Sequence, residues 1–274
     1  MKNLQNNEIV TAQTVNLTNC DREQIHIPGS IQPHGVLIVL DKESLKIIQV
    51  SYNSQNFLGY THSELITKSL TELLGEAQSQ LIESCLNKDF NTINPVKLSL
   101  NQLFFNGIIH AINNYIILEL EPIDSLDKND FFNFYQMTKG IITQIQYTAN
   151  LNELCQVIVT KIRELTGFDR VMIYRFDQDL SGNIIAENKR DDLESFLGLH
   201  YPATDIPQPA RKLYLLNLIR LIPDVDYQEI ALPNHPETNE FFDLSFAVLR
   251  SVSPIHLEYL TNMGVKASMS ISLI

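Results

Sequence analysis

The segment from Glu121 to Asp130 constrains the fold of this chain more than any other. It is acidic and has no apolar period, which is typical of a linker and not of a helix or strand in a core. Patterned, partly apolar sequence lies on both sides of it. A chain of 274 residues exceeds one small core and suits two domains of ~100 to 150 residues each. We therefore expect two modules, with the linker itself at residues 123–130.

The first module alternates strands with helices. A capping box at Thr61–Glu64 marks a helix start in its middle, and Asn113-Asn114 forms a turn that tolerates positive φ. This order of elements indicates a small α+β domain at residues 25–122, behind an extended leader at residues 1–24. Its strands are predicted at residues 35–40, 47–50, 96–100, 103–112 and 115–120.

The second module, at residues 131–274, begins with a long helical pattern that ends at Gly167. A hairpin follows, and we expect its turn to use Gly182 for positive φ. The sequence stops inside a predicted strand at 267–274. Because the edge of a sheet is normally paired or covered, we expect this module to be incomplete at its C-terminal end. The other predicted elements are strands at 171–176, 184–187 and 218–222 and helices at 209–217 and 256–263.

Composition argues against several classes of function. The net charge of −12 comes with no basic cluster that could follow a phosphate backbone, so nucleic acid and anionic membranes are poor partners. No run approaches ~18 apolar residues and the N-terminus lacks the regions of a signal peptide, which indicates a cytoplasmic protein. Three scattered cysteines do not form a disulfide framework.

The sequence gives no positive sign of an enzyme or a metal site. It contains no histidine or cysteine spacing typical of zinc, no phosphate-binding loop and no nucleophile elbow. We set aside a Ser–His hydrolase built on Ser251 or Ser253, because no third, orienting carboxylate can be named.

Cys20 stands out in the leader. It lies outside any apolar period, so the reactivity of its thiol is a better reason for a cysteine at this position than packing in a core. Cys85 and Cys155 fall among apolar residues of helical patterns and are expected in the core. Soon after Cys20 comes the unusual string HIPGSIQPHG at residues 26–35.

Another group of residues suits a large anionic ligand. Asp205 lies between prolines in the segment PATDIP, which holds the backbone away from helix. Taken alone, Asp205 would be a capping aspartate in a loop, and His256 would be an interior histidine whose hydrogen bonds are satisfied within the protein. Together with Tyr214, Arg220 and Arg250 they match a flat dianionic ligand with ring N–H groups, because arginines pair with carboxylates.

Three segments, at residues 26–35, 202–207 and 250–260, together resemble the chromophore-binding half of a bacteriophytochrome, a red-light photoreceptor that holds a linear tetrapyrrole. The resemblance covers the whole chain and implies a PAS domain followed by most of a GAF domain. It also implies a figure-of-eight knot between the leader and a GAF insertion. The bacterial branch attaches biliverdin through a thioether at the position of Cys20. The plant-like branch uses a GAF cysteine where this chain has Ile255, so biliverdin is favoured over phycocyanobilin.

The same resemblance implies roles for further residues. Asp205 would meet the pyrrole N–H groups, and Ile206 and Pro207 would pack against the rings. Arg220 and Arg250 would clamp the propionates, and His256 would organise a buried water. The clamps would be helped by Tyr214, Ser253, Ser268 and Ser270. The D-ring cage, whose looseness permits Z-to-E isomerisation, would be formed by Met172, Tyr174, Phe196, Tyr201, Tyr259 and Met263.

The resemblance also bears on partners. It implies a longer parent chain in which a PHY domain and a histidine kinase follow, signalling in a two-component system, and in which a homodimer can form. The module would attach its own bilin and would otherwise not be an enzyme. The alternative is a pigment-free PAS-GAF unit that senses another ligand or dimerises. Covalent attachment of a coloured pigment that depends on Cys20 would separate these two hypotheses.

Overall fold

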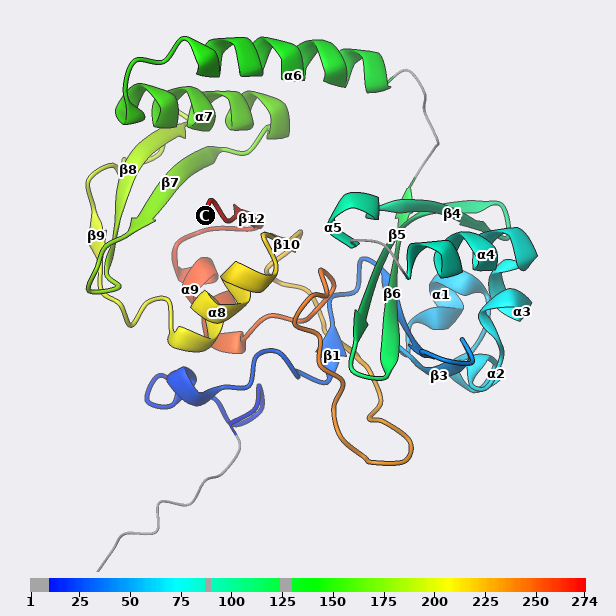
Figure 1. Cartoon of the computed structure of the whole chain (residues 1–274). Helices are drawn as coiled ribbons and strands as arrows, with labels where there is room; N and C mark the ends of the chain where they lie inside the picture. Colours follow the sequence, from blue (N-terminus) through cyan, green and yellow to red (C-terminus); the bar gives the residue numbers. More distant parts are fainter. Residues whose placement is uncertain (1–9, 87–89, 124–129) are drawn as a thin grey trace, which may run out of the picture. The chain divides into compact units, whose positions relative to one another are not determined.

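The computed structural model describes residues 10–86, 90–123 and 130–274 (Figure 1). The first nine residues of the predicted leader and most of the predicted linker lie outside this range. The chain forms two compact units. The large unit combines Met1–Leu126 with Gln208–Ile274, and the small unit is Asp127–Pro207.

A five-stranded antiparallel sheet forms the centre of the large unit (Figure 1). The strand order is β3-β2-β6-β5-β4, and all five predicted strands are confirmed. The predicted turn is confirmed too, since Asn113 has a φ of 52°. The strands are β2 (Val36–Asp41), β3 (Ile47–Val50), β4 (Val96–Leu100), β5 (Leu103–Ile112) and β6 (Tyr115–Ile123).

Short helices cover one face of this sheet. The predicted capping box at Thr61 is present, and Ser69 starts the next helix with a second one. Their apolar faces pack on Ile38, Phe105 and Leu118 of the sheet to form the main core. The helices are α1 (Ser54–Leu58), α2 (His62–Leu65), α3 (Leu70–Leu74), α4 (Glu76–Cys85) and α5 (Phe90–Ile93).

The linker prediction is wrong at its N-terminal end. The strand β6 continues through Glu121 to Ile123, with Phe105 opposite Pro122 and Phe104 opposite Ile123. The ten residues of β5 supply the backbone partners for this extension. An acidic local sequence cannot show that such a partner exists, because strand formation depends on tertiary pairing.

Two segments that are distant in sequence cover the other face of the sheet. The strand β1 (Ser30–Ile31) pairs with β11 (Ile230–Ala231). Leu37 and Ile117 of the sheet pack with Ile31 and with a group of apolar side chains after β11. These two short strands were not predicted, because two residues are too few to show a period. The group after β11 consists of Leu232, Phe242, Leu244, Ala247 and Leu249.

The remainder of the large unit forms a smaller helix-and-strand layer. Its predicted elements are present, but the last strand is shorter than the predicted 267–274, because β10 offers only four residues to pair with. Ile222, Val225 and Leu260 form the core between them. The elements are α8 (Gln208–Leu216), β10 (Ile219–Ile222), α9 (Pro254–Asn262) and β12 (Ser268–Ile271).

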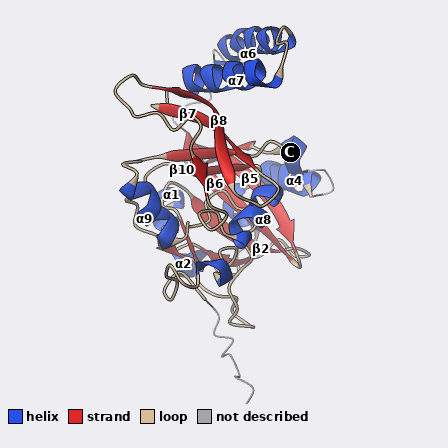
Figure 2. Cartoon of the chain, turned by 90° about the vertical axis from the view of Figure 1, so that its left-hand side faces the viewer, coloured by secondary structure: helices blue, strands red, loops and turns tan. Residues whose placement is uncertain are grey.

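The described part of the small unit has two helices and a three-stranded antiparallel sheet (Figure 2). The helical pattern predicted as continuous breaks after residue 146, and Asn150 caps the second helix by accepting the N–H of Glu153. Cys155 and Val159 pack this helix on the sheet. The elements are α6 (Asp130–Gln146), α7 (Leu151–Thr166), β7 (Arg170–Phe176), β8 (Gly182–Lys189) and β9 (His200–Tyr201).

The prediction that Gly182 supplies the positive φ of the hairpin turn is also wrong. The positive φ in the hairpin turn belongs to Leu180, at 67°. Gly182 instead lies under the ring of Tyr174, where an added Cβ would come within 2.0 Å of ring carbons. A close approach of a side chain, not a turn conformation, therefore requires glycine here.

Candidate functional site

Arg220, on β10, is a partly buried arginine whose charge is not balanced. Its guanidinium stacks on the ring of Tyr214 from α8, 3.9 Å from the ring centre. Its Nη1 donates to the carbonyl of Asn217 (2.7 Å) and to Oγ of Ser272 (3.0 Å). Burial lowers its pKa, although Tyr214 raises it. The facing strand β12 presents the two predicted serines, Ser268 and Ser270.

Arg250 is buried more deeply. Its Nη1 donates to the carbonyl of Ile25 at 2.8 Å. Burial lowers the pKa of its guanidinium to about 10, against the opposing effects of Tyr214 and Tyr227. Among the described residues, neither Arg250 nor Arg220 forms an ion pair, and Nε of each has no hydrogen-bond partner.

Arg220 and Arg250 need an anionic partner. A buried cation without a close ion-pair partner is unfavourable, and its unpaired N–H groups add a further cost. Glu23 and Glu119 interact with the charge of Arg250 but form no ion pair with it. A ligand with two carboxylates would supply both the charge and the acceptors. The structure therefore supports Arg220 and Arg250 as an anion-binding pair within the large unit.

Ser253 shows a contact that the sequence did not predict. It precedes α9, but its hydroxyl does not cap that helix and instead donates to Oε2 of Glu23 at 2.6 Å. Burial raises the pKa of Glu23, while Ser253 and the charge of Arg250 lower it. Glu23 lies in no motif, so only the fold could show that the leader meets α9. Tyr227 was missed for the same reason, and its hydroxyl accepts the N–H of Val252 at 2.9 Å.

His256 lies on α9 beside Tyr259. The two rings are parallel to within 10°, with centroids 6.4 Å apart. Burial lowers the pKa of His256, so its imidazole is neutral near pH 7 and can donate through one nitrogen and accept through the other. Met263 follows at the C-cap of the same helix.

Cys20 opens a short 3-10 helix, η1 (Cys20–Arg22), which lies beside α8. The thiol is free and partly exposed, with Sγ 4.0 Å from the carbonyl oxygen of Leu17. Since α8 also carries Tyr214, the fold brings the cysteine of the leader close to the helix that supports Arg220. The other cysteines, Cys85 and Cys155, are buried in the two cores as predicted.

The small unit carries the other predicted site residues. Its β7 turns Val171 and Ile173 toward α7, which leaves Met172 on the opposite face, 39% exposed. The ring of Tyr174 lies 6.0 Å from that of Tyr201. Asp205 is exposed, and its N–H donates to the carbonyl of Pro202 at 3.1 Å in a tight turn. Ile206 and Pro207, directly after it, are half-buried.

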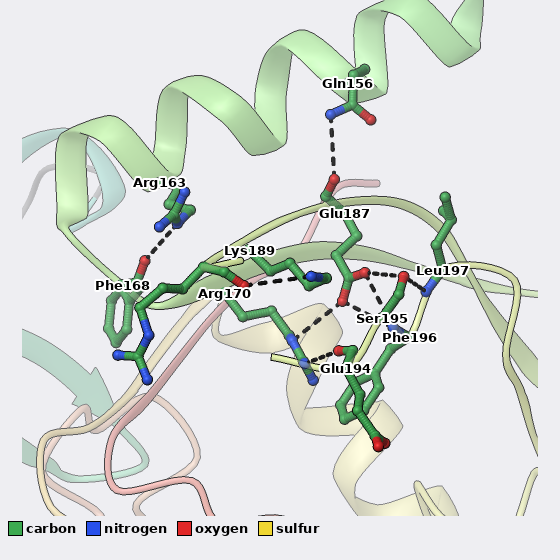
Figure 3. Close-up of polar contacts among 11 residues, drawn as sticks. Gln156, Arg163, Phe168, Arg170, Glu187, Lys189, Glu194, Ser195, Phe196 and Leu197 are labelled. Carbon is green, nitrogen blue, oxygen red and sulfur yellow. Dashed lines mark hydrogen bonds and ion pairs between the residues drawn. The ribbon is translucent and has the colours of Figure 1, made fainter. Parts of the chain in front are cut away.

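A polar network in the small unit fixes Phe196 (Figure 3). The guanidinium of Arg170 lies on the Phe196 ring, 3.5 Å from its centre, and Nε lies 3.2 Å from Glu187. Glu187 accepts the hydroxyl of Ser195 at 2.6 Å and the N–H of Phe196 at 3.1 Å. Arg170 also donates to the carbonyl of Glu194. Burial raises the pKa of Glu187, but these hydrogen bonds and the Arg170 charge lower it overall.

We expect Glu187→Ala to release this loop. Removing the carboxylate leaves the Phe196 amide without its acceptor, so that amide should exchange with deuterium ~10-fold faster. Glu164→Ala is the matched control, because Glu164 pairs with Lys161 at the surface of α7 in the same unit. Hydrogen exchange of the peptide around Phe196 measures the effect. Equal exchange in both variants would contradict the assigned role of Glu187.

We searched the described residues for membrane-spanning helices and for metal sites. None of their helices is both long and apolar enough to cross a membrane. They also contain no cluster of three or more His, Cys, Asp or Glu side chains that could hold a metal ion.

Comparison with known proteins shows the family of this chain. A family model of the PAS fold matches residues 20–123, and a model of the GAF domain matches residues 150–274. The structure superposes on the chromophore-binding domain of a Stigmatella aurantiaca phytochrome with a TM-score of 0.87 and 44% sequence identity, covering 93% of this chain and 86% of that one. This chain belongs to the bacteriophytochrome family. The prediction of an α+β fold with a PAS and then a GAF domain is confirmed.

This chain spans about a third of the length of two phytochromes that it resembles. The chain is 47% identical to cyanobacterial phytochrome B of Nostoc and 44% identical to a bacteriophytochrome of Pseudomonas aeruginosa. These alignments cover 97% and 95% of this chain but 36% of each relative.

Proposed function

We propose that this bacteriophytochrome module binds biliverdin covalently through Cys20 and signals after photoisomerisation of the pigment. One observation carries the proposal: Arg220 and Arg250 are desolvated cations with unpaired N–H groups in the unit that also holds the free thiol. Biliverdin offers two propionates to the arginines and a vinyl group to the thiol. Its bound form supplies the light absorption and the Z-to-E isomerisation.

The arginines and their neighbours would hold the propionates. Arg220 is already oriented by Tyr214 and Ser272, so little side-chain freedom remains to be lost on binding. The hydroxyls of Ser253, Ser268 and Ser270 would complete the acceptor and donor set. The neutral imidazole of His256 suits a partner that must both donate and accept, such as an ordered water between rings.

The covalent step needs only the cysteine and proximity. The Cys20 sulfur would form a bond to a vinyl carbon while the vinyl π bond breaks, and the thiol proton would end on the neighbouring carbon. Atoms and electrons balance without an oxidant or a reductant. The module would thus attach its own pigment and need no other enzymatic activity.

Residues of the small unit would contact the rings. We assign the backbone of Asp205 to the pyrrole N–H groups and Ile206 and Pro207 to packing against the rings. Large apolar side chains that are exposed, such as Met172, suit a loose cage around the D ring. In the small unit, this cage would consist of Met172, Tyr174, Phe196 and Tyr201.

The proposal extends to the architecture of a longer chain. The leader at 1–24 would thread through the GAF insertion as a knot. Support comes from the residues directly after the leader, because the N–H of Leu232 donates to the carbonyl of Gly29 and the N–H of Leu244 donates to the carbonyl of His26. The PAS domain at 25–122, the linker at 123–130 and the GAF domain from residue 131 would pass the signal to a PHY domain and a cytoplasmic histidine kinase. That parent protein would act as a homodimer, without nucleic acid or membrane partners.

The test asks whether covalent pigment attachment depends on Cys20. Biliverdin added to the purified chain should give a sharp red absorption band, and denatured protein should show zinc-enhanced bilin fluorescence. We expect Cys20→Ser to lose the fluorescence completely, since no thioether can form, while Cys85→Ser keeps it because Cys85 is buried in the core. If Cys20→Ser retained the fluorescence, Cys20 could not be the attachment site.

A pigment-free PAS-GAF signalling or dimerisation unit is the alternative function. It predicts no sharp red band from the wild-type chain or from a longer chain that includes further domains. The unpaired arginines favour the bilin hypothesis, because a module without an anionic ligand gains nothing from burying them.

A further inference from the structure

Glu119 is a fully buried carboxyl group in the PAS sheet that the proposed function does not use. It lies on β6, on the same face as Tyr115 and Ile117. That face packs against apolar residues of the insertion after β11. Burying a carboxyl group among apolar side chains is unfavourable unless it is well hydrogen-bonded, so its presence needs an explanation.

The partners of Glu119 are two successive backbone amides. Oε1 accepts the N–H of Val248 at 3.1 Å, and Oε2 accepts the N–H of Leu249 at 2.6 Å. The next residue in the chain is Arg250. A carboxyl group that holds two amides at once fixes both the position and the direction of the backbone that enters Arg250.

The segment at β1, residues 30–32, holds the same backbone from its other edge. The N–H of Gln32 donates to the carbonyl of Leu249 at 2.7 Å, and Ser251 donates to Ser30 at 3.2 Å. The side-chain amide of Gln32 reaches the carbonyl of Arg250 at 3.3 Å. The backbone around Arg250 is therefore held by residues 30–32 on one edge and by the PAS sheet through Glu119.

We propose that Glu119 is a positioning residue for Arg250: by accepting the amides of Val248 and Leu249, it lets the PAS sheet set the geometry of the propionate clamp. This inference rests on the proposed function for its ligand. Glu119 itself would not contact the pigment, because both of its oxygens are engaged by the backbone of the insertion.

The experiment compares biliverdin with its dimethyl ester, whose propionates carry no charge. Reversible affinities are measured in the Cys20→Ser background for three variants of the full chain. Glu119→Leu suits the surrounding apolar cluster and removes both acceptors, while Glu119→Gln keeps one. Glu121→Gln is the control, because Glu121 lies on the same strand but pairs with His34, at 3.3 Å.

We expect Glu119→Leu to weaken biliverdin binding about 10-fold and ester binding less than about 2-fold. Glu119→Gln should lie between Glu119→Leu and the wild type, and Glu121→Gln should match the wild type. Hydrogen exchange gives a readout that needs no pigment: the amides of Val248 and Leu249 should exchange at least ~10-fold faster in Glu119→Leu, with helices of the same unit unchanged.

Several results would overturn the inference. Equal losses for biliverdin and ester would show a general packing effect, and unchanged affinities would show that Arg250 does not depend on Glu119. A wild-type chain that binds neither pigment would overturn the proposed function instead. In that case hydrogen exchange still decides the positioning role, which fails if Val248 and Leu249 stay protected in Glu119→Leu. If Glu119→Leu does not fold, Glu119→Asp, one methylene too short to reach both amides, takes its place in each comparison.

Discussion

Arg250→Met should make the pigment-free protein more stable and at the same time weaken biliverdin binding by about 100-fold or more. Burial lowers the pKa of Arg250 to about 10, so the charged side chain costs the folded state ~3 kcal/mol. Methionine removes that cost but also the bond to Ile25, which offsets ~1 kcal/mol. The net gain should be ~1–2 kcal/mol, or a few degrees in Tm.

The affinity loss in Arg250→Met has a separate cause. A carboxylate that enters a desolvated site without its cation loses ~2–5 kcal/mol of interaction. Thermal melts without pigment and titrations with biliverdin measure the two effects. Arg190→Met is the control, since Arg190 forms only surface ion pairs with Asp169 and Asp192, which contribute little. A pigment-free Arg250→Met protein less stable than the wild type would contradict this explanation of Arg250.

Stability should fall by ~2 kcal/mol between pH 6.5 and pH 8, and Glu119→Gln should remove that fall. Burial raises the pKa of Glu119 from 4.5 to about 8, opposed by the amides of Leu249 and Val248 and by Arg250, while Glu121 raises it further. The folded state then holds a proton that the unfolded chain has released. The stabilisation is complete below the unfolded pKa and is lost as the pH rises through 8.

A second buried group explains why the fall begins only near pH 6.5. Burial lowers the pKa of His110 from 6.5 to about 4, although Asp243 raises it, so stability from this group increases between pH 4 and 6.5 and cancels the effect of Glu119 there. His110 Nδ1 lies 4.0 Å from Glu119 Oε1. Chemical unfolding at pH 5, 6.5, 8 and 9 measures the profile. The stability of Glu119→Gln should rise to pH 6.5 and then stay level. Glu121→Gln should keep most of the fall, because burial, and not Glu121, is the largest cause of the raised pKa of Glu119. A level wild-type profile above pH 6.5 would show that Glu119 titrates normally.

Local sequence was sufficient wherever neighbouring residues decide the outcome. The five strands of the PAS sheet follow from apolar runs and turn residues, and the capping box at Thr61 follows from a spacing of three residues. It was insufficient where a distant partner decides. The extension of β6 to Ile123 needs β5, the shortening of β12 follows from β10, and Gly182 is required by the ring of Tyr174.

The candidate site divides in the same way. The three segments at residues 26–35, 202–207 and 250–260 were sufficient to predict the family by resemblance. The residue types at Arg220, Arg250 and His256 predicted an anionic ligand, because arginines pair with carboxylates. Only the tertiary structure decided which of them lack partners and what holds them in place. Glu23 reaches Ser253 across 230 positions, and Glu119 reaches Leu249 across 130. Contacts at such separations depend on how layers pack, and desolvation depends on everything around a group, so neither is written in the residues next to it.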